Sequence, residues 1–250
     1  MTEDSEIRSP VLLARETISR ARACAISPRV YILQLPVAFR YIAIEGPIGV
    51  GKTRLAERLA HRIDGSTVLE DAENPFLADF YNERPGAALQ AQLFYLLNRH
   101  RQLSGLRQAD LFRHTTVCDY LFDRDKIFAY LNLDDNELFI YQRLFDLLAR
   151  DIPSPDLVVY LQAPTDVLLA RLEARPVDPE RPFPQPDAEY LRELNEAYQH
   201  FFFHYTSTPL LVIETSQFDA DTDDTALDDL VRQVHAMGKG TRYYVPRTKE

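Results

Sequence analysis

A glycine-rich segment between a short apolar run and a helical pattern constrains this chain more than any other feature. The run Tyr41–Glu45 has the pattern of a buried strand, and the next eight residues, Gly46–Thr53 (GPIGVGKT), fit G-x-x-x-x-G-K-[S/T]. Apolar residues at helical spacing follow at once, at Leu55, Leu59 and Ile63. Strand, glycine loop and helix in this order predict a P-loop, in which backbone N–H groups converge on phosphate oxygens at a helix N-terminus. The alternative is a glycine-rich turn that binds nothing, and the complete motif in this context argues against it.

Each residue of this motif has a predicted role in binding a nucleotide. The ammonium group of Lys52 is expected to reach the β- and γ-phosphates, and the hydroxyl of Thr53 is expected to ligate Mg²⁺. The residues expected to surround the phosphates are Gly46, Pro47, Ile48, Gly49, Val50, Gly51, Lys52 and Thr53.

The rest of the chain predicts an α/β fold with one parallel sheet. Five short apolar or β-branched runs are separated by helical patterns, which is the order expected of parallel strands with helices on both faces. The five predicted strands are Tyr41–Glu45, Ser66–Glu70, Thr115–Asp119, Asp156–Gln162 and Leu210–Thr215. We therefore expect a P-loop kinase fold with a five-stranded sheet.

Two helices are predicted with particular features. The longest spans Gly86–His114 and has a leucine stripe formed by Leu89, Leu93, Leu96, Leu97 and Leu103. Asp134 and Glu137 form a predicted capping box for the helix that follows.

Composition limits the partners and the compartment. The chain has 250 residues and a net charge of −10, which argues against nucleic-acid and membrane-surface binding. Two cysteines, Cys24 and Cys118, cannot form a disulfide framework, so a cytoplasmic location is expected. No apolar run approaches the roughly 18 residues of a membrane span. Residues 1–36 are expected to be an N-terminal extension, a candidate for disorder, before a single domain over 37–250.

Carboxylates follow several of the predicted strands. Ligands in open parallel sheets lie beyond the carboxyl ends of the strands, so these acids should gather around the P-loop. Glu70 suits a general base that takes a proton from an attacking hydroxyl, with Asp71 and Glu73 as alternatives. Asp119 is a candidate for holding Mg²⁺ through water, and an ordinary turn residue is the other interpretation.

Polar residues on two predicted helices complete the candidate site. Gln90 precedes Leu93 and Leu97 by three and seven residues, so its amide is predicted to lie along the apolar stripe. There it could bind the edge of a nucleobase, or it could bond to a neighbouring helix. Arg171 and Arg175 lie one helical turn apart before a proline-rich segment, as in a lid that stabilises a transferring phosphoryl group. A solvated basic face is the alternative.

Six segments in order resemble the bacterial branch of the deoxynucleoside kinases, the deoxyadenosine/deoxyguanosine kinase-like proteins. They are YIAIEGPIGVGKT, ENPFLADFY, ALQAQLFYLLNRHRQL, CDYLFDRDKIFA, PDLVVYLQAPTDVLLARL and LNEAYQHFFFHY, and the similarity extends to GTRYYVP. The resemblance covers roughly Tyr41 to Pro246, about four-fifths of the chain. It implies transfer of the ATP γ-phosphate to the 5′-hydroxyl of a deoxynucleoside, with a preference for purines, by a homodimer that serves nucleotide salvage. It also assigns Glu70 as the base, Gln90 as the base-edge amide and Tyr81 as a contact of the sugar 3′-hydroxyl.

The chain departs from this family pattern at two places. Many relatives have an acidic residue, Arg and Ser after the third strand, whereas this chain has Asp119-Tyr-Leu, so Arg99 and Arg124 are candidates to replace the arginine. The lid pattern R-x-x-x-R-x-R lacks its third arginine, and Arg181 is a candidate replacement.

Two other functions compete with this prediction. A nucleoside monophosphate kinase binds a dianionic acceptor, which the acid at position 70 disfavours by like-charge repulsion. A P-loop NTPase switch or assembly module is disfavoured because the guanine motif N-K-x-D of GTPases is absent and because the arginine-bearing lid segment suits a kinase better.

Overall fold

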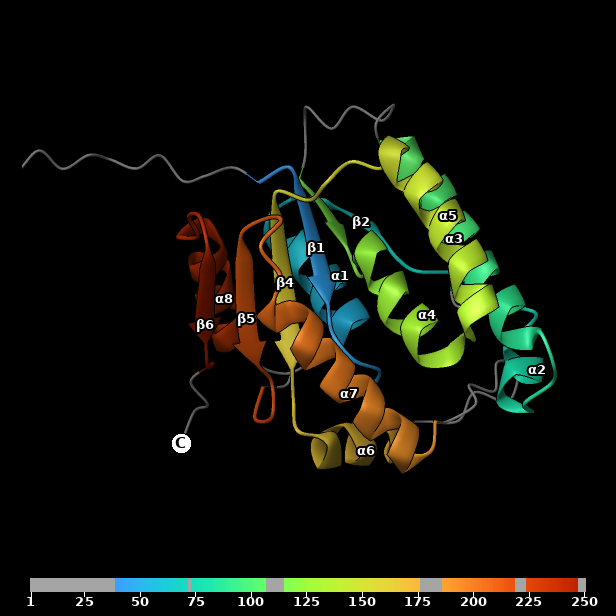
Figure 1. Cartoon of the computed structure of the whole chain (residues 1–250). Helices are drawn as coiled ribbons and strands as arrows, with labels where there is room; N and C mark the ends of the chain where they lie inside the picture. Colours follow the sequence, from blue (N-terminus) through green and yellow to red (C-terminus); the bar gives the residue numbers. More distant parts are fainter. Residues whose placement is uncertain (1–38, 72, 107–114, 176–185, 219–223, 247–250) are drawn as a thin grey trace, which may run out of the picture. The chain divides into compact units, whose positions relative to one another are not determined.

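A parallel sheet of six strands forms the centre of the computed structural model, which describes residues 39–71, 73–106, 115–175, 186–218 and 224–246 (Figure 1). The order of the strands is β2-β3-β1-β4-β5-β6, so the strand that leads into the P-loop lies inside the sheet. The strands are β1 (Tyr41–Glu45), β2 (Ser66–Val68), β3 (Thr116–Cys118), β4 (Leu157–Gln162), β5 (Leu210–Glu214) and β6 (Thr241–Tyr244).

The prediction of a parallel α/β sheet is confirmed, but the predicted number of five strands is wrong. The sixth strand, β6, pairs with β5 in parallel, with Leu210 beside Thr241 and Ile213 beside Tyr244. It lies at the edge of the sheet and three of its four side chains are exposed. The segment therefore lacks the apolar pattern that identified the other strands.

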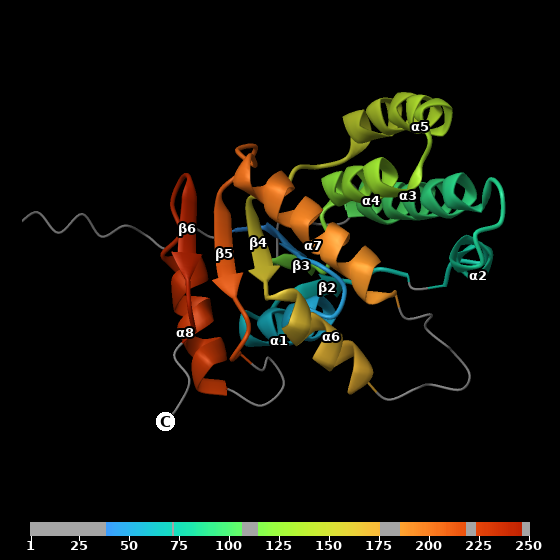
Figure 2. The same cartoon turned by 60° about the horizontal axis from the view of Figure 1, so that its bottom comes forward.

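Helices cover both faces of the sheet, as predicted (Figures 1 and 2). They are α1 (Lys52–Arg62), α2 (Leu77–Tyr81), α3 (Ala87–Leu106), α4 (Asp125–Asn132), α5 (Asp135–Leu148), α6 (Thr165–Glu173), α7 (Ala188–Phe203) and α8 (Asp224–His235). Two short 3₁₀ helices, Phe122–Arg124 and Ala149–Asp151, precede α4 and follow α5. No helix in these described ranges has the length and apolar character needed to cross a membrane.

The alternation of side chains along β1 divides the core into two layers. Ile42 and Ile44 belong to a cluster with apolar residues of α1, α6 and α8, whereas Tyr41 and Ala43 belong to a cluster with residues of α3, α4, α5 and α7. Successive side chains of a strand point to opposite faces. Glu45 therefore projects from the same face as Tyr41 and Ala43, toward α4 and α7.

The predictions for the two helices had different outcomes. The capping box is confirmed. The Asp134 carboxylate accepts hydrogen bonds from the backbone N–H groups of Asn136 and Glu137, and the Glu137 carboxylate accepts one from the Asp134 N–H. The leucine stripe is only partly correct, because Leu96 is buried whereas Leu97 is 55% exposed. The buried face of α3 thus lies at a different angle around the helix axis from the predicted one.

Some predictions concern residues outside the described ranges. They include the N-terminal extension over residues 1–36, the end of the predicted helix over 107–114, and most of the proline-rich lid segment with Arg181.

Candidate functional site

The P-loop joins the carboxyl end of β1 to the first turn of α1, as its sequence predicts (Figure 1). Gly49 and Gly51 have φ angles of 83° and 99°, a region that residues with a Cβ rarely adopt. At Gly49 a Cβ would also lie 3.1 Å from the side chain of Leu172, so α6 packs directly on the loop. These glycines give the loop a backbone path that other residues would strain.

The side chain of Lys52 folds back over this loop. Its Nζ donates hydrogen bonds to the carbonyl oxygens of Gly46, at 2.7 Å, and Pro47, at 3.1 Å. Burial lowers the pKa of Lys52 to about 8, although the carboxylate of Glu45 opposes the shift. The ammonium group is therefore held where it can exchange these carbonyl oxygens for phosphate oxygens.

Asp119 connects the P-loop with the segment that carries the predicted base. It follows β3 and is buried, and its Oδ2 accepts a hydrogen bond of 2.6 Å from the Thr53 hydroxyl. Its Oδ1 accepts a bond of 2.7 Å from the backbone N–H of Glu70. The structure thus brings together three of the residues that the sequence predicted for the site.

Glu70 lies between two buried arginines. Arg124 Nη2 is 2.6 Å from each carboxylate oxygen of Glu70, and Arg99 Nε donates to Oε1 at 2.9 Å. Burial by itself raises the pKa of Glu70, but Arg124 and Arg99 outweigh burial and lower the pKa to about 2. The side chain of Glu70 keeps 22% of its surface exposed, so the ionised carboxylate can still be reached by a substrate. The two arginines named as candidates in the sequence therefore both lie at this position.

Each arginine has a second, fully buried acidic partner. Arg99 forms an ion pair with Asp125, and Arg124 Nη1 lies 3.5 Å from Glu45 Oε1. Glu45, Arg124, Glu70, Arg99 and Asp125 together form a continuous series of charged contacts, which we call the buried charge network. Neither Glu45 nor Asp125 was predicted as a site residue, since nothing in the linear sequence places them beside the arginines.

The structure contradicts the predicted burial of Gln90 and points to Gln92 instead. Gln90 is exposed, whereas Gln92 is 6% exposed and its amide has no hydrogen-bond partner among the described residues. Gln92 and Arg99 are seven residues apart on α3, so they share one side of the helix about 10 Å apart along its axis. The amide atoms of Gln92 are not fully enclosed, so a ligand that offers a donor and an acceptor can reach them. The correct signal was the helical spacing between these two polar residues.

Tyr81 ends the short helix α2 and is half-buried. Burial raises the pKa of its phenol well above the usual value, and the neighbouring hydroxyls of Tyr190 and Tyr95 add to the shift. Tyr95 also lies under the guanidinium group of Arg99, at 4.9 Å from the ring centroid. Tyr95 therefore interacts electrostatically with Tyr81 and packs against Arg99 of the buried charge network.

The two lid arginines do not share one helix in the structure. Arg171 belongs to α6, but this helix ends at Glu173, so Arg175 lies two residues beyond it. The guanidinium group of Arg171 donates to the hydroxyl of Thr215, at 3.2 Å, and to the carbonyl oxygens of Thr215 and Phe218. In this arrangement Arg171 contacts the loop that follows β5.

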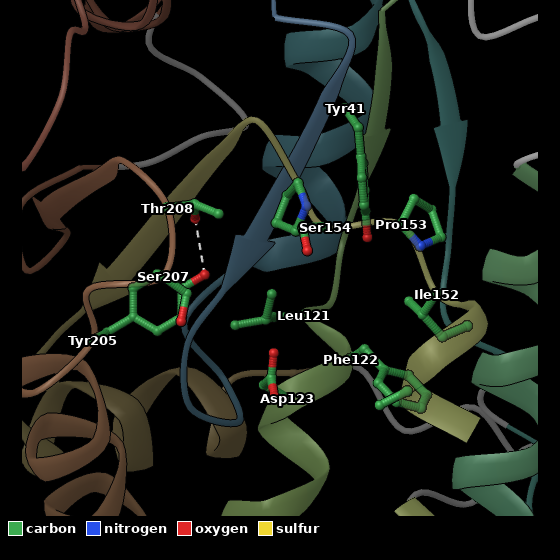
Figure 3. A pocket seen from close by; sticks show the side chains of 12 residues that line it. Tyr41, Leu121, Phe122, Asp123, Ile152, Pro153, Ser154, Tyr205, Ser207 and Thr208 are labelled. Carbon is green, nitrogen blue, oxygen red and sulfur yellow. Dashed lines mark hydrogen bonds between the residues drawn. The ribbon is translucent and has the colours of Figure 1, made fainter. Parts of the chain in front are cut away.

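A pocket of about 80 Å³ lies elsewhere in the domain (Figure 3). Its lining includes Tyr41, the loop Ile152–Pro155 and Tyr205, whose hydroxyl lies 2.9 Å from that of Thr208. The lining also includes Leu121, Phe122 and Asp123, which follow β3, and the backbone N–H of Leu121 donates to Glu45 of the buried charge network. Lys52, Thr53, Glu70 and Asp119 do not line it. The pocket is smaller than the roughly 300 Å³ at which ligand pockets begin, so it is not the candidate nucleotide site.

Comparison with known proteins agrees with the geometry. A family model described as deoxynucleoside kinase matches residues 42–238. The chain is 34% identical over 162 residues to the deoxyguanosine kinase of Bacillus subtilis (strain 168), which covers 64% of this chain and 76% of that protein. It is 25% identical over 205 residues to the deoxyadenosine/deoxycytidine kinase of the same organism, with coverage of 78% and 92%.

A solved structure shows the same fold. The deoxyadenosine kinase from M. mycoides with bound dCTP superposes with a TM-score of 0.62 at 22% identity, over 77% of this chain and 97% of that one. The family model covers most of the chain and includes the P-loop, the buried charge network and α6. The chain therefore belongs to the deoxynucleoside kinase family, enzymes that phosphorylate deoxynucleosides.

Proposed function

We propose that this protein transfers the γ-phosphoryl group of ATP to the 5′-hydroxyl of a purine deoxynucleoside. The observation that carries the proposal is the position of Glu70: it is an ionised, reachable carboxylate whose backbone is tied through Asp119 to Thr53 of the P-loop. An acid at this place suits a neutral hydroxyl as the acceptor, because a phosphate acceptor would be repelled by it.

The proposed mechanism uses Glu70 as the general base. A carboxylate accepts the proton of the 5′-hydroxyl as the oxygen attacks the γ-phosphorus, and such positioned proton transfer contributes about 10²–10⁴-fold in rate. Lys52 and the P-loop backbone hold the phosphates of the donor. Arg171 and Arg175 are proposed to stabilise the transferring group when the lid closes, which requires Arg171 to leave Thr215 and Phe218.

Gln92, rather than Gln90, is proposed to bind the nucleobase. Its distance from Arg99 along α3, about two turns, suits a nucleoside that lies along the helix with its 5′ end at Glu70. An amide presents a donor and an acceptor together, as a base edge requires. Tyr81 is proposed to contact the sugar hydroxyl from α2.

A purine preference is supported by the names of the relatives. The compared kinases are a deoxyguanosine kinase, a deoxyadenosine/deoxycytidine kinase and a deoxyadenosine kinase, and each name includes a purine deoxynucleoside. The amide of Gln92 alone does not select between purines and pyrimidines.

Thr53 and Asp119 are proposed to hold Mg²⁺. The two side-chain oxygens converge to 2.6 Å, and both are of the hard type that Mg²⁺ prefers. Within the described ranges, no group of three or more His, Cys, Asp or Glu side chains could hold a metal ion. Mg²⁺ usually takes one or two protein ligands together with water and substrate phosphates. When bound, it would neutralise charge on the phosphates of ATP.

A homodimer in the cytoplasm is the proposed form of the enzyme. The outer side of α5 exposes four apolar side chains, Phe139, Ile140, Leu144 and Leu147. Contiguous apolar patches of this kind mark protein interaction sites. Cys118 is a free thiol in the core, which suits a reducing compartment.

The test is a panel of eight nucleosides and deoxynucleosides, followed by ADP release from ATP. We expect deoxyguanosine or deoxyadenosine to have the highest kcat/KM. A thymidine or deoxycytidine optimum would refute the purine preference. Phosphorylation of a deoxynucleoside monophosphate but not of a deoxynucleoside would refute the proposed acceptor.

A further inference from the structure

The guanidinium group of Arg124 contacts two carboxylates that lie at the ends of two different strands. It comes from the short helix before α4, and its side chain is buried. Its Nη2 is 2.6 Å from both oxygens of Glu70, which follows β2, and its Nη1 is 3.5 Å from Glu45 Oε1 at the end of β1. A planar guanidinium can contact two carboxylates at once, which a single ammonium does less well.

Glu45 is held in place independently of Arg124. Its side chain is fully buried and accepts hydrogen bonds from the backbone N–H groups of Gly46, at 2.8 Å, and Leu121, at 2.7 Å. The hydroxyl of Tyr198 donates a third, at 3.1 Å. Because Gly46 is the first residue of the P-loop, the Glu45 carboxylate is fixed directly before the phosphate-binding loop.

Arg99 contacts the other side of Glu70 and has its own buried anion. That anion is Asp125, which is fully buried. Glu70 would therefore keep one cationic partner if Arg124 were removed, but Glu45 would lose the cation in the buried charge network that neutralises it. An unpaired buried charge is strongly destabilising, whereas a neutral pair of similar size is tolerated.

We propose that Arg124 is a positioning residue that holds the Glu70 carboxylate in its reactive place and, through Glu45, couples it to the P-loop. The base for the acceptor and the loop for the donor are then assembled as one unit, although they follow different strands. This inference rests on the proposed role of Glu70 as general base. It also identifies how the chain supplies an arginine at this site when none directly follows Asp119.

A double-mutant cycle separates this role from a merely structural one. If Arg124 acts by positioning the Glu70 carboxylate, its loss should matter much less once that carboxylate has been replaced by an amide. A residue that only stabilised the fold would instead have the same effect in both backgrounds.

The experiment compares kcat and KM of variants of the full chain that circular dichroism shows to be folded. Arg124→Met should lower kcat by about 10²-fold, the effect of a small misplacement of a reacting group, and should change KM for the deoxynucleoside less. Arg124→Lys restores the positive charge and should recover part of kcat. In a Glu70→Gln background, Arg124→Met should lower kcat only slightly further, because the carboxylate that Arg124 positions is gone. If Arg124→Met does not fold, Arg124→Lys, which keeps a cation beside Glu45, is used in the same comparison.

Lys126→Ala is the matched control, since Lys126 lies two residues further on, is partly exposed and pairs only with Asp123 among acidic groups of the described chain. It should have the wild-type kcat and KM. Fully additive losses from the Arg124 and Glu70 substitutions in a folded double variant would overturn the proposal. Glu70→Gln alone isolates the underlying assumption: near-normal kcat in that variant would refute the base itself, not the role of Arg124.

Discussion

Lys52 Nζ lies 2.7 Å from the carbonyl oxygen of Gly46, so the lysine of the P-loop is bonded to the first residue of its own loop. Two consequences follow for a donor nucleotide. Its phosphates must displace this contact, and they meet an ammonium group whose pKa has been lowered to about 8, mainly by burial.

ATP binding near pH 8 should therefore be accompanied by proton uptake. The phosphates favour the charged form of Lys52, which is only about half populated at a pH equal to its pKa. Calorimetric titrations in buffers of different ionisation enthalpy would measure the uptake. Lys52→Arg is the control. The guanidinium group of the new arginine stays protonated, so the proton uptake that comes from Lys52 should be absent in this variant. Equal uptake in both proteins would assign the proton to another group.

Glu70→Gln should lower kcat by about 10²–10⁴-fold, because the variant keeps the shape of the side chain and loses the base. KM for the deoxynucleoside should change less. Glu73→Gln is the matched control, since Glu73 is an exposed acid three residues further on, and its backbone N–H donates to the Asp71 carboxylate. If Glu73→Gln were the slower enzyme in a steady-state assay, the base would have to be reassigned.

Gln92→Ala should raise KM for the deoxynucleoside about tenfold, the effect of losing one or two buried hydrogen bonds. Gln90→Ala, two residues away on the exposed side of α3, should change KM less than twofold. Initial-rate measurements with saturating ATP compare the two variants directly. The reverse order of effects would restore the original assignment of Gln90.

Leu147→Glu should convert the enzyme from dimer to monomer, because it places a charge in the exposed apolar stripe of α5, where Leu147 is 58% exposed. Light scattering after size-exclusion chromatography would measure the mass. Asp146→Asn, on the same helix, should leave the mass unchanged. A wild-type protein that is monomeric at assay concentration would refute the proposed dimer.

Arg171→Ala should lower kcat more than it changes KM for ATP, if the arginine reaches the phosphoryl group in the transition state. Thr215→Val removes one of the acceptors of Arg171 without removing the cation, and it should have a smaller effect on kcat. Should the two variants behave alike, with the loss mainly in KM for ATP, Arg171 would instead act by fixing the loop after β5.

The part of the site that could be predicted is the part whose residues are contiguous in the sequence. The P-loop is such a case, because Gly46–Thr53 determines both the path of the backbone and the chemistry. Arg99 and Arg124 were candidates only through the family resemblance. Their joint contact with Glu70 does not follow from the residues alone, since the three come from separate elements and meet only after the sheet has formed.

Two further errors have simple physical origins. The prediction for Gln90 is wrong because the leucines define the buried face of α3 only approximately. Leu97 is exposed, and Gln92 lies on the buried face. The strand β6 was missed because an exposed edge strand does not need the apolar alternation that marks a buried one.

The side-chain amide of Asn195 joins the two helices that flank the proline-rich lid segment. Its Nδ2 donates to the carbonyl oxygen of Ala163 and to the hydroxyl of Thr165, both at 3.1 Å, which ties α7 to the start of α6. Since α6 itself packs on the P-loop through Leu172 and Gly49, α7 is connected through α6 to the phosphate-binding loop. A displacement of α7 would therefore be transmitted to that loop, so the helix serves as a mechanical support of the donor site.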